Sequence, residues 1–344
     1  MFKSGKSIVG LDIGSSAVKA VELTRVGKDI QVTGFGQVEL ASEDPQDCVQ
    51  AISDLMREGG FRTKRVVTSV SGKMVIIRYL SMVPMGDDEL RNAILFEAEK
   101  YIPFTLDECA LDCQRLDESE SSQQGGASAN VLLVAVKNAV LEHHLGIVQK
   151  AGLAPEIVDV DAFAIGNAWS LLRECSGASE EEGPVAFVDV GSSKTCLNVV
   201  QDGRSLFTRE IYFGGKDLTG AISRRMSLDE NEAEGLKRAP GERFDEVREA
   251  VFPTIDDLGN ELQLSFDYFE SQNGVGPTKI FLSGGGSRFG FFRESFEKIF
   301  EKPTVVFNPF EGLPVSDEID QDLLASGGPQ LVVAVGLASR IRKA

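Results

Sequence analysis

The sequence predicts an α/β fold that consists of two related lobes. Residues 9–16 read VGLDIGSS and residues 186–193 read AFVDVGSS, so one short motif occurs twice. Each copy is followed by an alternating apolar run, a polar turn and a second run, which is typical of strand, turn and strand. The chain has 344 residues, more than twice the ~150 of a typical domain. A repeat this long indicates a duplicated domain, because solenoid units have only ~20 to 50 residues.

The strands expected after each motif occupy similar places in the two copies. In the first copy the runs cover residues 17–23 and 30–40, and in the second they cover residues 194–200 and 205–213. Asp202 and Gly203 between the second pair form a strong hairpin signal, and Gly27 has the same part in the first. Each lobe is therefore expected to begin with three antiparallel strands.

Composition and charge exclude several classes of protein. The chain is 42% hydrophobic and 26% charged, which is enough apolar material for a real core. With 53 acidic and 35 basic residues the net charge is −18, so nucleic acid and anionic lipid are not expected partners. Apolar runs stay far below the ~18 residues that span a bilayer. We expect a cytoplasmic protein that does not insert directly into the membrane.

The cysteines and histidines give little sign of a metal site. The five cysteines are scattered along a large chain, as reduced and packed thiols are. Cys109 and Cys113 lie four apart and His143 and His144 are adjacent, which leaves a metal site conceivable. No second paired motif completes such a site, so it is not favoured.

The repeated motif has the chemistry that a polyphosphate needs. In Asp-x-Gly-Ser-Ser the glycine lets the backbone approach closely, while hydroxyl and amide groups donate to anionic oxygens. An aspartate at the strand end can hold Mg²⁺, directly or through water. A single Asp-x-Gly-Ser turn is more often only a tight turn. Two copies in equivalent places favour a phosphate site, with Asp12 and Asp189 as the metal carboxylates.

A glycine triplet supplies a further candidate for nucleotide binding. Residues 279–287, KIFLSGGGS, read as a short buried strand that ends in three glycines, and residues 289–300 follow with helical spacing. A loop of this kind can lie flat against a nucleotide, although it is also common as a plain strand-to-helix connection. The dinucleotide fingerprint does not fit, and residues 5–7 lack the earlier glycine of a phosphate-binding P-loop.

Taken together, these features resemble the ATPase fold shared by actin, heat-shock chaperones and sugar kinases. Segments 159–167 and 331–338 fit the two helices that cross between the lobes of that fold. Within the superfamily, the chain is similar first to the PilM family of actin-like type IV pilus assembly proteins. The second resemblance is to the FtsA family of division proteins. Residues 89–104, ELRNAILFEAEKYIPF, are the most specific match and mark a small inserted α+β subdomain there.

The resemblance also implies a domain plan with a nucleotide cleft between the lobes. The first lobe is expected at residues 1–184, with the inserted subdomain at about 81–155. The second lobe is expected at 185–330, with a nucleotide-capping part at about 216–278, and residues 331–344 form the crossing helix that returns to the first lobe. Residues 176–183 read as the linker between lobes.

Carried over position by position, the resemblance implies ATP and Mg²⁺ as ligands. The first phosphate element is expected at Asp12, Gly14, Ser15, Ser16 and Lys19, the second at Asp189, Gly191, Ser192 and Ser193, the ribose and adenine pair at Glu234 and Lys237, and the adenosine loop at Gly284, Gly285, Gly286, Ser287 and Arg288. Without the family, Glu234 and Lys237 are only an exposed i, i+3 ion pair.

One departure from the superfamily bears on catalysis. Actin has a glutamine in its first crossing helix that orients the attacking water. The nearest polar residues here are Asp161 and Asn167, and Asp161 is the one candidate for a catalytic role. We therefore expect ATP hydrolysis to be slow at most.

The family resemblance implies protein partners at the inner membrane. The expected partner is a PilN-like N-terminal cytosolic peptide, with other inner-membrane and motor components of the pilus and self-association as further expectations. Tyr101, Pro103 and Phe104 are either an exposed docking patch or the anchor of a helix end. Residues 117–130 read as a hairpin tip. The alternatives are a small-molecule kinase of the same superfamily and an FtsA-like filament-forming protein.

Overall fold

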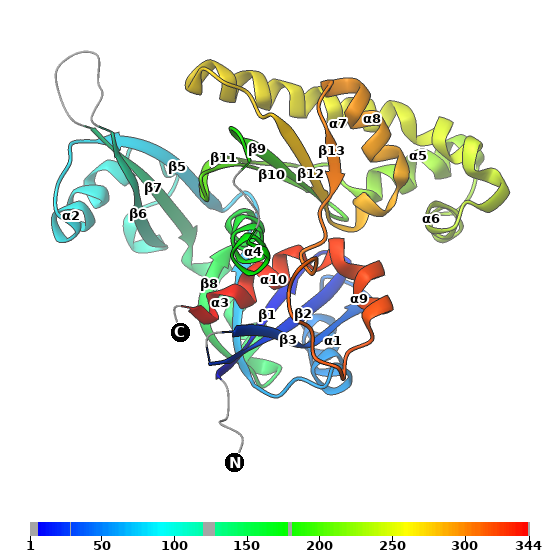
Figure 1. Cartoon of the computed structure of the whole chain (residues 1–344), viewed down its shortest axis with the longest axis horizontal. Helices are drawn as coiled ribbons and strands as arrows, with labels where there is room; N and C mark the ends of the chain where they lie inside the picture. The colour runs from blue at the N-terminus through cyan, green and yellow to red at the C-terminus, as the bar shows by residue number, and fades with distance from the viewer. Residues whose placement is uncertain (1–5, 28, 120–127, 178–180, 343–344) are drawn as a thin grey trace. The chain divides into compact units, whose positions relative to one another are not determined.

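The computed structural model describes residues 6–27, 29–119, 128–177 and 181–342 (Figure 1). The chain separates into two compact units, one comprising Met1–Ser69 and Gly152–Ala344 and the other Val70–Ala151. The predicted boundaries of the two lobes divide the chain differently from these two units, and they stay predictions. The predicted hairpin tip and interlobe linker lie partly outside the described residues.

The larger unit contains two sheets with the same order of strands. Each runs third, second, first, fourth and fifth in its own chain order. The first sheet consists of β3 (Asp29–Glu39), β2 (Ala17–Val26), β1 (Lys6–Ile13), β4 (Arg65–Val70) and β8 (Ala154–Val160), and the second of β11 (Arg204–Ile211), β10 (Thr195–Gln201), β9 (Val185–Val190), β12 (Lys279–Ser283) and β13 (Thr304–Val306). This shared order confirms the duplicated two-lobe fold that the repeat predicts.

The turns inside each repeat also follow the sequence. Asp202 and Gly203 both have positive φ angles, 52° and 73°, as a two-residue hairpin turn of the favoured kind requires. Gly27 has φ 69° between β2 and β3. The β1–β2 and β9–β10 pairs are antiparallel, whereas β4 and β12 join β1 and β9 in parallel.

The helices of the larger unit cover these sheets. They are α1 (Pro45–Glu58), α4 (Asp161–Ser176), α5 (Gly215–Met226), α6 (Glu230–Arg238), α7 (Phe244–Asn273), α8 (Gly290–Phe300), α9 (Gln321–Gly327) and α10 (Val332–Ala338). Helix α1 packs against β2 and β3. Helix α4 follows the last strand of the first lobe but packs against β10 and β11, while α10 follows the second lobe and packs against β1 and β2.

Helices α4 and α10 lie against each other (Figure 1), and two glycines permit close contacts of α10 with α4 and with β1. A Cβ on Gly336 of α10 would lie 1.7 Å from the backbone oxygen of Ala164 in α4. A Cβ on Gly10 of β1 would lie 1.9 Å from the backbone oxygen of Ala334. Neither overlap can be relieved by a side-chain rotation, because the atoms met belong to the backbone. Small residues at these positions therefore let α10 pack directly against the backbone of α4 and against β1.

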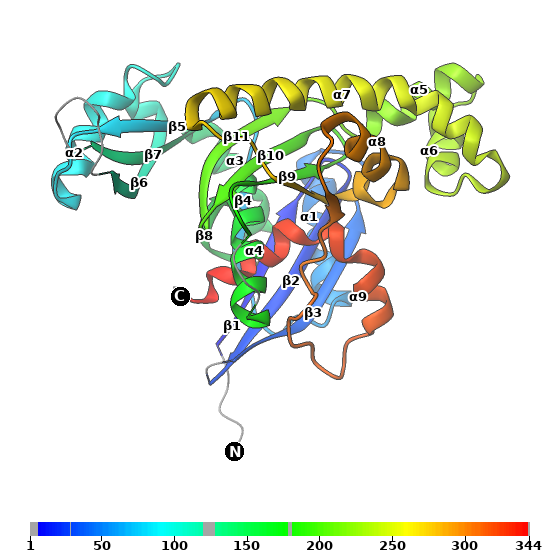
Figure 2. The ribbon, with the colours of Figure 1, turned by 45° about the horizontal axis from the view of Figure 1, so that its top comes forward.

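The second lobe has two aromatic layers. On one face of its sheet, Trp169 of α4 packs against Phe187, Phe281 and Phe307, with ring centroids 4.8 to 5.7 Å apart. The 30-residue helix α7 runs along the sheet with α8 (Figure 2), and both contribute phenylalanines such as Phe266 and Phe296 to a continuous buried cluster. The sheet of this lobe is thus covered by helices on both faces.

The smaller unit is a three-stranded antiparallel sheet with helices. Its strands are ordered β5 (Val75–Met82), β7 (Ser128–Lys137) and β6 (Cys109–Ser119), and its helices are α2 (Asp87–Ala98) and α3 (Asn138–Lys150). Leu90, Ile94 and Ala98 of α2 pack with Val131, Leu133 and Ala135 of β7. Strands and helices in one small unit match the α+β subdomain predicted within the fold.

In the part of the chain that the structure describes, no single helix is long and apolar enough to cross a membrane. Segments Gln321–Gln330 and Val332–Ile341 pass such a test together by length and composition only, with a bend of 96° between them.

Candidate functional site

The first Asp-x-Gly-Ser turn joins β1 to β2 and carries a buried ion pair. Asp12 lies near the end of β1 and is paired in register with Lys19 of β2. Lys19 Nζ lies 3.2 Å from Asp12 Oδ2, and the two side chains are 19% and 10% exposed. The strand pairing thus places an ammonium group beside the carboxylate at the turn.

The charges at this turn influence one another strongly. Burial raises the pKa of Asp12, and the Coulombic attraction of Lys19 opposes that rise. Burial would lower the pKa of Lys19, but Asp12 and Asp189 outweigh burial and hold that pKa above its ordinary value. Lys19 is therefore a firmly charged group that serves the aspartates of both turns.

The second turn, between β9 and β10, repeats the first in its backbone. The amide of Gly14 donates to the carbonyl of Ala17 at 3.1 Å, and the amide of Gly191 donates to the carbonyl of Lys194 at 2.9 Å. Asp189 accepts a hydrogen bond of 2.6 Å from Ser283 Oγ. Burial raises the pKa of Asp189, while the bond from Ser283 opposes the rise.

The two turns meet through their serines. Ser193 Oγ donates to Ser15 Oγ at 2.7 Å, although the two residues are 178 positions apart in the chain. Ser16 lies beside this contact in the first turn, and its carbonyl accepts the amide of Leu40. The fold brings the sequence-predicted residues of both turns to one place.

The glycine triplet lies against the end of β9. Gly284 has φ 80°, and a Cβ there would lie 2.4 Å from the carbonyl oxygen of Val190, the residue after Asp189. A Cβ on Gly286 would lie 2.4 Å from Val190 Cγ1. Ser287 closes the loop by donating to the carbonyl of Gly284 at 2.7 Å, and Arg288 is exposed. Glycine is therefore required at positions 284 and 286 for this approach of the loop to the second turn.

The Glu234–Lys237 pair differs from the exposed pair that its spacing alone suggests. Lys237 is buried, and its Nζ donates to Glu234, to the carbonyl of Gly215 and to Thr219 at 2.5, 2.9 and 2.7 Å. Burial lowers the pKa of Lys237, against the effect of Glu234. Because α6 packs on α5, the lysine points inward to the start of α5 and ties the two helices together.

The two candidate residues of the first crossing helix, Asp161 and Asn167, both have hydrogen-bond partners. Asp161 Oδ1 accepts from Ser69 Oγ at 2.6 Å, and Oδ2 lies 3.0 Å from Lys194 Nζ. Asn167 donates to Asp159, which is also bound by Arg340. Asp161 thus lies close to the two turns, whereas Asn167 belongs to a structural cluster at the other crossing helix.

Several residues at the site were not singled out from the sequence. Lys194 bridges Asp161 and Glu210, and the amides of Gly215 and Lys216 donate to the carbonyls of Gly191 and Ser192 at 2.9 and 2.8 Å. A Cβ on Gly214 would lie 2.5 Å from Ser192 O. The adjacent glycines at 214 and 215, directly after a predicted strand, were the available signal.

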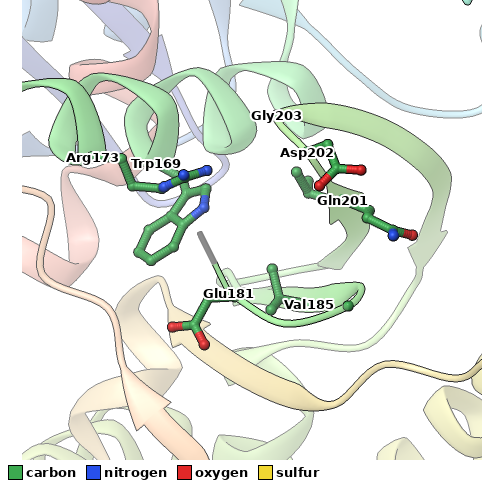
Figure 3. Close-up of a pocket in the computed structure, with 9 residues that line it drawn as sticks. Trp169, Arg173, Glu181, Val185, Gln201, Asp202 and Gly203 are labelled. Carbon is green, nitrogen blue, oxygen red and sulfur yellow. The ribbon is translucent and has the colours of Figure 1, made fainter. Parts of the chain in front are cut away.

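A separate small pocket lies at the opposite end of the second sheet (Figure 3). It is lined by Trp169, Arg173, Glu181, Gly183, Val185, Val200, Gln201, Asp202 and Gly203. Val185 begins β9 and Asp189 lies near its end, about 13 Å along an extended strand. This pocket is therefore distinct from the paired turns.

Within the described ranges, no group of three or more His, Cys, Asp or Glu side chains is arranged to hold a metal ion. Cys109 and Cys113 are free thiols that pack against the same apolar cluster of the smaller unit. A divalent cation at the turns would consequently need ligands besides Asp12 and Asp189, such as water or phosphate oxygens.

The repeated sheets, the crossing helices and the paired turns define an actin-like fold. MreB 5 of Spiroplasma citri, solved with bound AMPPNP, has a similar fold at 12% identity, with a TM-score of 0.52 over 98% of this chain and 96% of that one. The chain belongs to the family described as type IV pilus assembly protein PilM, which it matches over residues 10–342.

Two further relatives agree with this placement. The structure of a PilM–PilN type IV pilus biogenesis complex is 28% identical, with a TM-score of 0.84 over 99% of each chain. The cell division protein FtsA of Pseudomonas aeruginosa is 24% identical over 94% of this chain and 88% of that protein. The predicted PilM-like and FtsA-related character is therefore confirmed.

Proposed function

We propose that this chain is a nucleotide-binding adaptor of type IV pilus assembly. In this proposal it binds ATP and Mg²⁺ between its lobes and a short cytosolic tail of a PilN-like membrane protein. The observation that carries the nucleotide part is the contact of two Asp-x-Gly-Ser turns, one from each lobe, at Ser15 and Ser193.

The residues at the turns have the chemistry that a triphosphate requires. Glycine occupies the places where a side chain would crowd the turn, since a Cβ would lie 3.1 Å from Ala17 O at Gly14 and 2.9 Å from Lys194 O at Gly191. Serine hydroxyls and the ammonium of Lys19 are donors for phosphate oxygens. The triplet of residues 284–286, with Ser287 and Arg288, would lie against the adenosine, and Glu234 and Lys237 would support the ribose side.

Asp12 and Asp189 are the residues that would hold Mg²⁺, directly or through water. Burial opposes the ionised form of both carboxylates, and a bound divalent cation would offset that cost. The metal would also screen the phosphate charge from the aspartates. Carboxylates at two strand ends, together with phosphate oxygens, suit the octahedral oxygen coordination of Mg²⁺.

Hydrolysis is expected to be slow. Asp161 has one carboxylate oxygen bonded to Ser69 and the other to Lys194, so orienting a water would require giving up a partner. Asn167 is bonded to Asp159. A catalytic role for Asp161 therefore stays a proposal, and a high turnover number would argue for a different water-orienting group.

The partner is inferred from the related complex and from charge. The similar PilM structure was solved with PilN. Cytoplasmic segments beside membrane helices are enriched in Lys and Arg, whereas this chain has a net charge of −18. Attraction between the two follows. A tail of about ten residues would bind near micromolar affinity, because its ordering offsets part of the contact energy.

The smaller unit exposes large apolar side chains. Val83 is 73% exposed, Phe96 75% and Tyr101 40%. Phe104, by contrast, packs against the core of the unit with Leu106 and Met85. The sequence left open whether this region is a docking patch or the anchor of a helix end. Tyr101 is exposed, as a docking residue would be, and Phe104 is packed, as an anchor would be. We propose Val83, Phe96 and Tyr101 as the tail-binding patch.

The test is capture of this protein by an immobilised peptide of the cytosolic N-terminal residues of its own PilN-like protein. Phe96→Asp should reduce capture at least tenfold, while Phe252→Asp, a 54% exposed phenylalanine on α7 of the other unit, should not. ATP affinity should be equal in both variants. Unchanged capture by Phe96→Asp would move the tail to another surface.

Recruitment to the inner membrane would then occur through this partner. Contacts with other inner-membrane and motor components, and self-association, stay predictions. A filament-forming role, the alternative that the resemblance to the FtsA family implies, is the second candidate, because FtsA of Pseudomonas aeruginosa is 24% identical to this chain. Sedimentation of the purified protein with and without MgATP separates a filament from an adaptor.

A further inference from the structure

Lys194 occupies an unusual place at the centre of the site. It follows Ser193 directly, so it is the first residue beyond the second turn. Its Nζ lies 3.0 Å from Asp161 Oδ2 and 3.2 Å from Glu210 Oε1. Asp161 begins α4, the helix that enters from the first lobe, whereas Glu210 lies on β11 of the second. One ammonium group therefore connects the second turn, the crossing helix and an edge strand.

The position of Lys194 relates it to the place where the two turns meet. Ser193 contacts Ser15 at 2.7 Å, and Lys194 follows it in the chain. Lys194 also acts electrostatically on Asp12 of the first turn. If both turns hold one chain of phosphates, as proposed above, the meeting point is where the outermost phosphate is shared between them. Lys194 is the lysine nearest to that point along the chain, since it is the residue after Ser193.

The present partners of Lys194 leave it able to exchange. Its side chain is 26% exposed, and it shares its charge between two carboxylates. Asp161 would not be left alone by such an exchange, because its other oxygen accepts from Ser69 at 2.6 Å. A terminal phosphate carries more charge than a carboxylate and offers three acceptor oxygens. It is therefore a strong competitor for the ammonium group.

We propose that Lys194 distinguishes nucleoside triphosphates from diphosphates by leaving Asp161 for the terminal phosphate. The inference rests on the proposed nucleotide site and assigns that site a γ-phosphate-selective residue. With a diphosphate, Lys194 keeps Asp161 and holds the start of α4 to the second turn. With a triphosphate, the ion pair between Lys194 and Asp161 is broken, so the start of α4 is no longer held to the second turn by Lys194. A purely structural ion pair would stabilise the fold without any such preference.

Calorimetric titration with MgATP and with MgADP tests the proposal. Lys194→Met keeps the length of the side chain and removes its charge. Affinity for ATP should fall about tenfold, the order of one charge-assisted hydrogen bond, while affinity for ADP should stay within about twofold. Lys279→Met is the matched control, because Lys279 is 28% exposed and lies 2.9 Å from Glu181 at the far end of the sheet. It should leave the ATP-to-ADP ratio unchanged.

A second variant checks the exchange itself. Asp161→Asn weakens the present hold on Lys194, so it should raise the ATP-to-ADP affinity ratio in the otherwise unchanged protein. In the Lys194→Met background the same substitution should change the ratio much less. Hydrogen exchange of the nucleotide-free protein gives an independent readout, since Lys194→Met should increase exchange at the first turn of α4.

The outcomes separate this inference from the function on which it rests. If the unaltered protein binds ATP and ADP but Lys194→Met weakens both equally or neither, Lys194 is a structural residue and only the inference fails. If the unaltered protein binds neither nucleotide, the proposed nucleotide site and the inference fail together.

Discussion

Replacing Gly336 by alanine tests the packing that joins the two lobes. A Cβ at this position would lie 1.7 Å from the carbonyl oxygen of Ala164, 2.5 Å from its carbonyl carbon and 3.0 Å from its Cα. All three atoms are backbone atoms of α4. Relief of the overlap therefore requires the two crossing helices to separate, and no change of rotamer can supply it.

The expected cost can be set against the gain from helix propensity. Alanine is favoured over glycine inside a helix by about 1 kcal/mol. Overpacking of a tight core costs about 1–3 kcal/mol, or more where the backbone must move. Because the overlap is with backbone, we expect the upper end of that range and a net loss of about 2 kcal/mol in the free energy of unfolding.

Urea unfolding followed by circular dichroism measures this loss, with Gly235→Ala as the control. Gly235 is also helical, but a Cβ there would meet nothing within 4 Å. It should gain up to about 1 kcal/mol from propensity alone. If Gly336→Ala were as stable as the unaltered protein, α4 and α10 would not be in backbone contact and the described lobe junction would be wrong.

Two further predictions concern buried groups of the site. Burial raises the pKa of Asp189, so the folded state holds its proton more tightly and the contribution of this residue to stability is lost as pH rises from about 4 through the folded-state pKa. Asp189→Asn should therefore be more stable than the unaltered protein near pH 7 in EDTA, and the difference should shrink toward pH 4. Urea unfolding across that pH range measures the difference. A difference that grows toward pH 4 would contradict the prediction. Burial also raises the pKa of the Cys196 thiol, whereas Cys175 is exposed. Ellman's reagent at pH 8 should modify Cys175 quickly and Cys196 only on unfolding; rapid labelling of Cys196, located by mass spectrometry, would show that β10 is accessible.

Much of the fold could be predicted because it repeats. The motif at residues 9–16 and 186–193 fixed the start of each lobe, and the alternating runs after it matched β2, β3, β10 and β11 to within a few residues. The order of the remaining strands could not be obtained in this way. Strands β4 and β8 are neighbours in the sheet although the whole inserted unit lies between them in the sequence. Strand β13 has only three residues, which is too few for a periodic signal.

The candidate site could likewise be predicted only where its residues are close together in the sequence. The turns and the glycine triplet could be predicted because each motif consists of consecutive residues. Lys194 was missed because its partners lie elsewhere in the chain, Asp161 at a separation of 33 residues and Glu210 at 16. The burial of Lys237 depends on the packing of α6 against α5, which the local i, i+3 spacing does not encode.

Calorimetric titration of MgATP into the purified protein, its Asp12→Ala and Asp12→Asn variants, and Asp256→Ala tests the central claim most directly. We predict saturable binding of one MgATP to the unaltered protein and to Asp256→Ala, whose exposed side chain lies on α7. Both Asp12 variants should bind about thirtyfold more weakly, which corresponds to about 2 kcal/mol for a lost charge-assisted contact. Unfolding curves of the four proteins establish that each is folded. Equal MgATP affinity in all four, or binding by none of them, would contradict a nucleotide site at the paired turns.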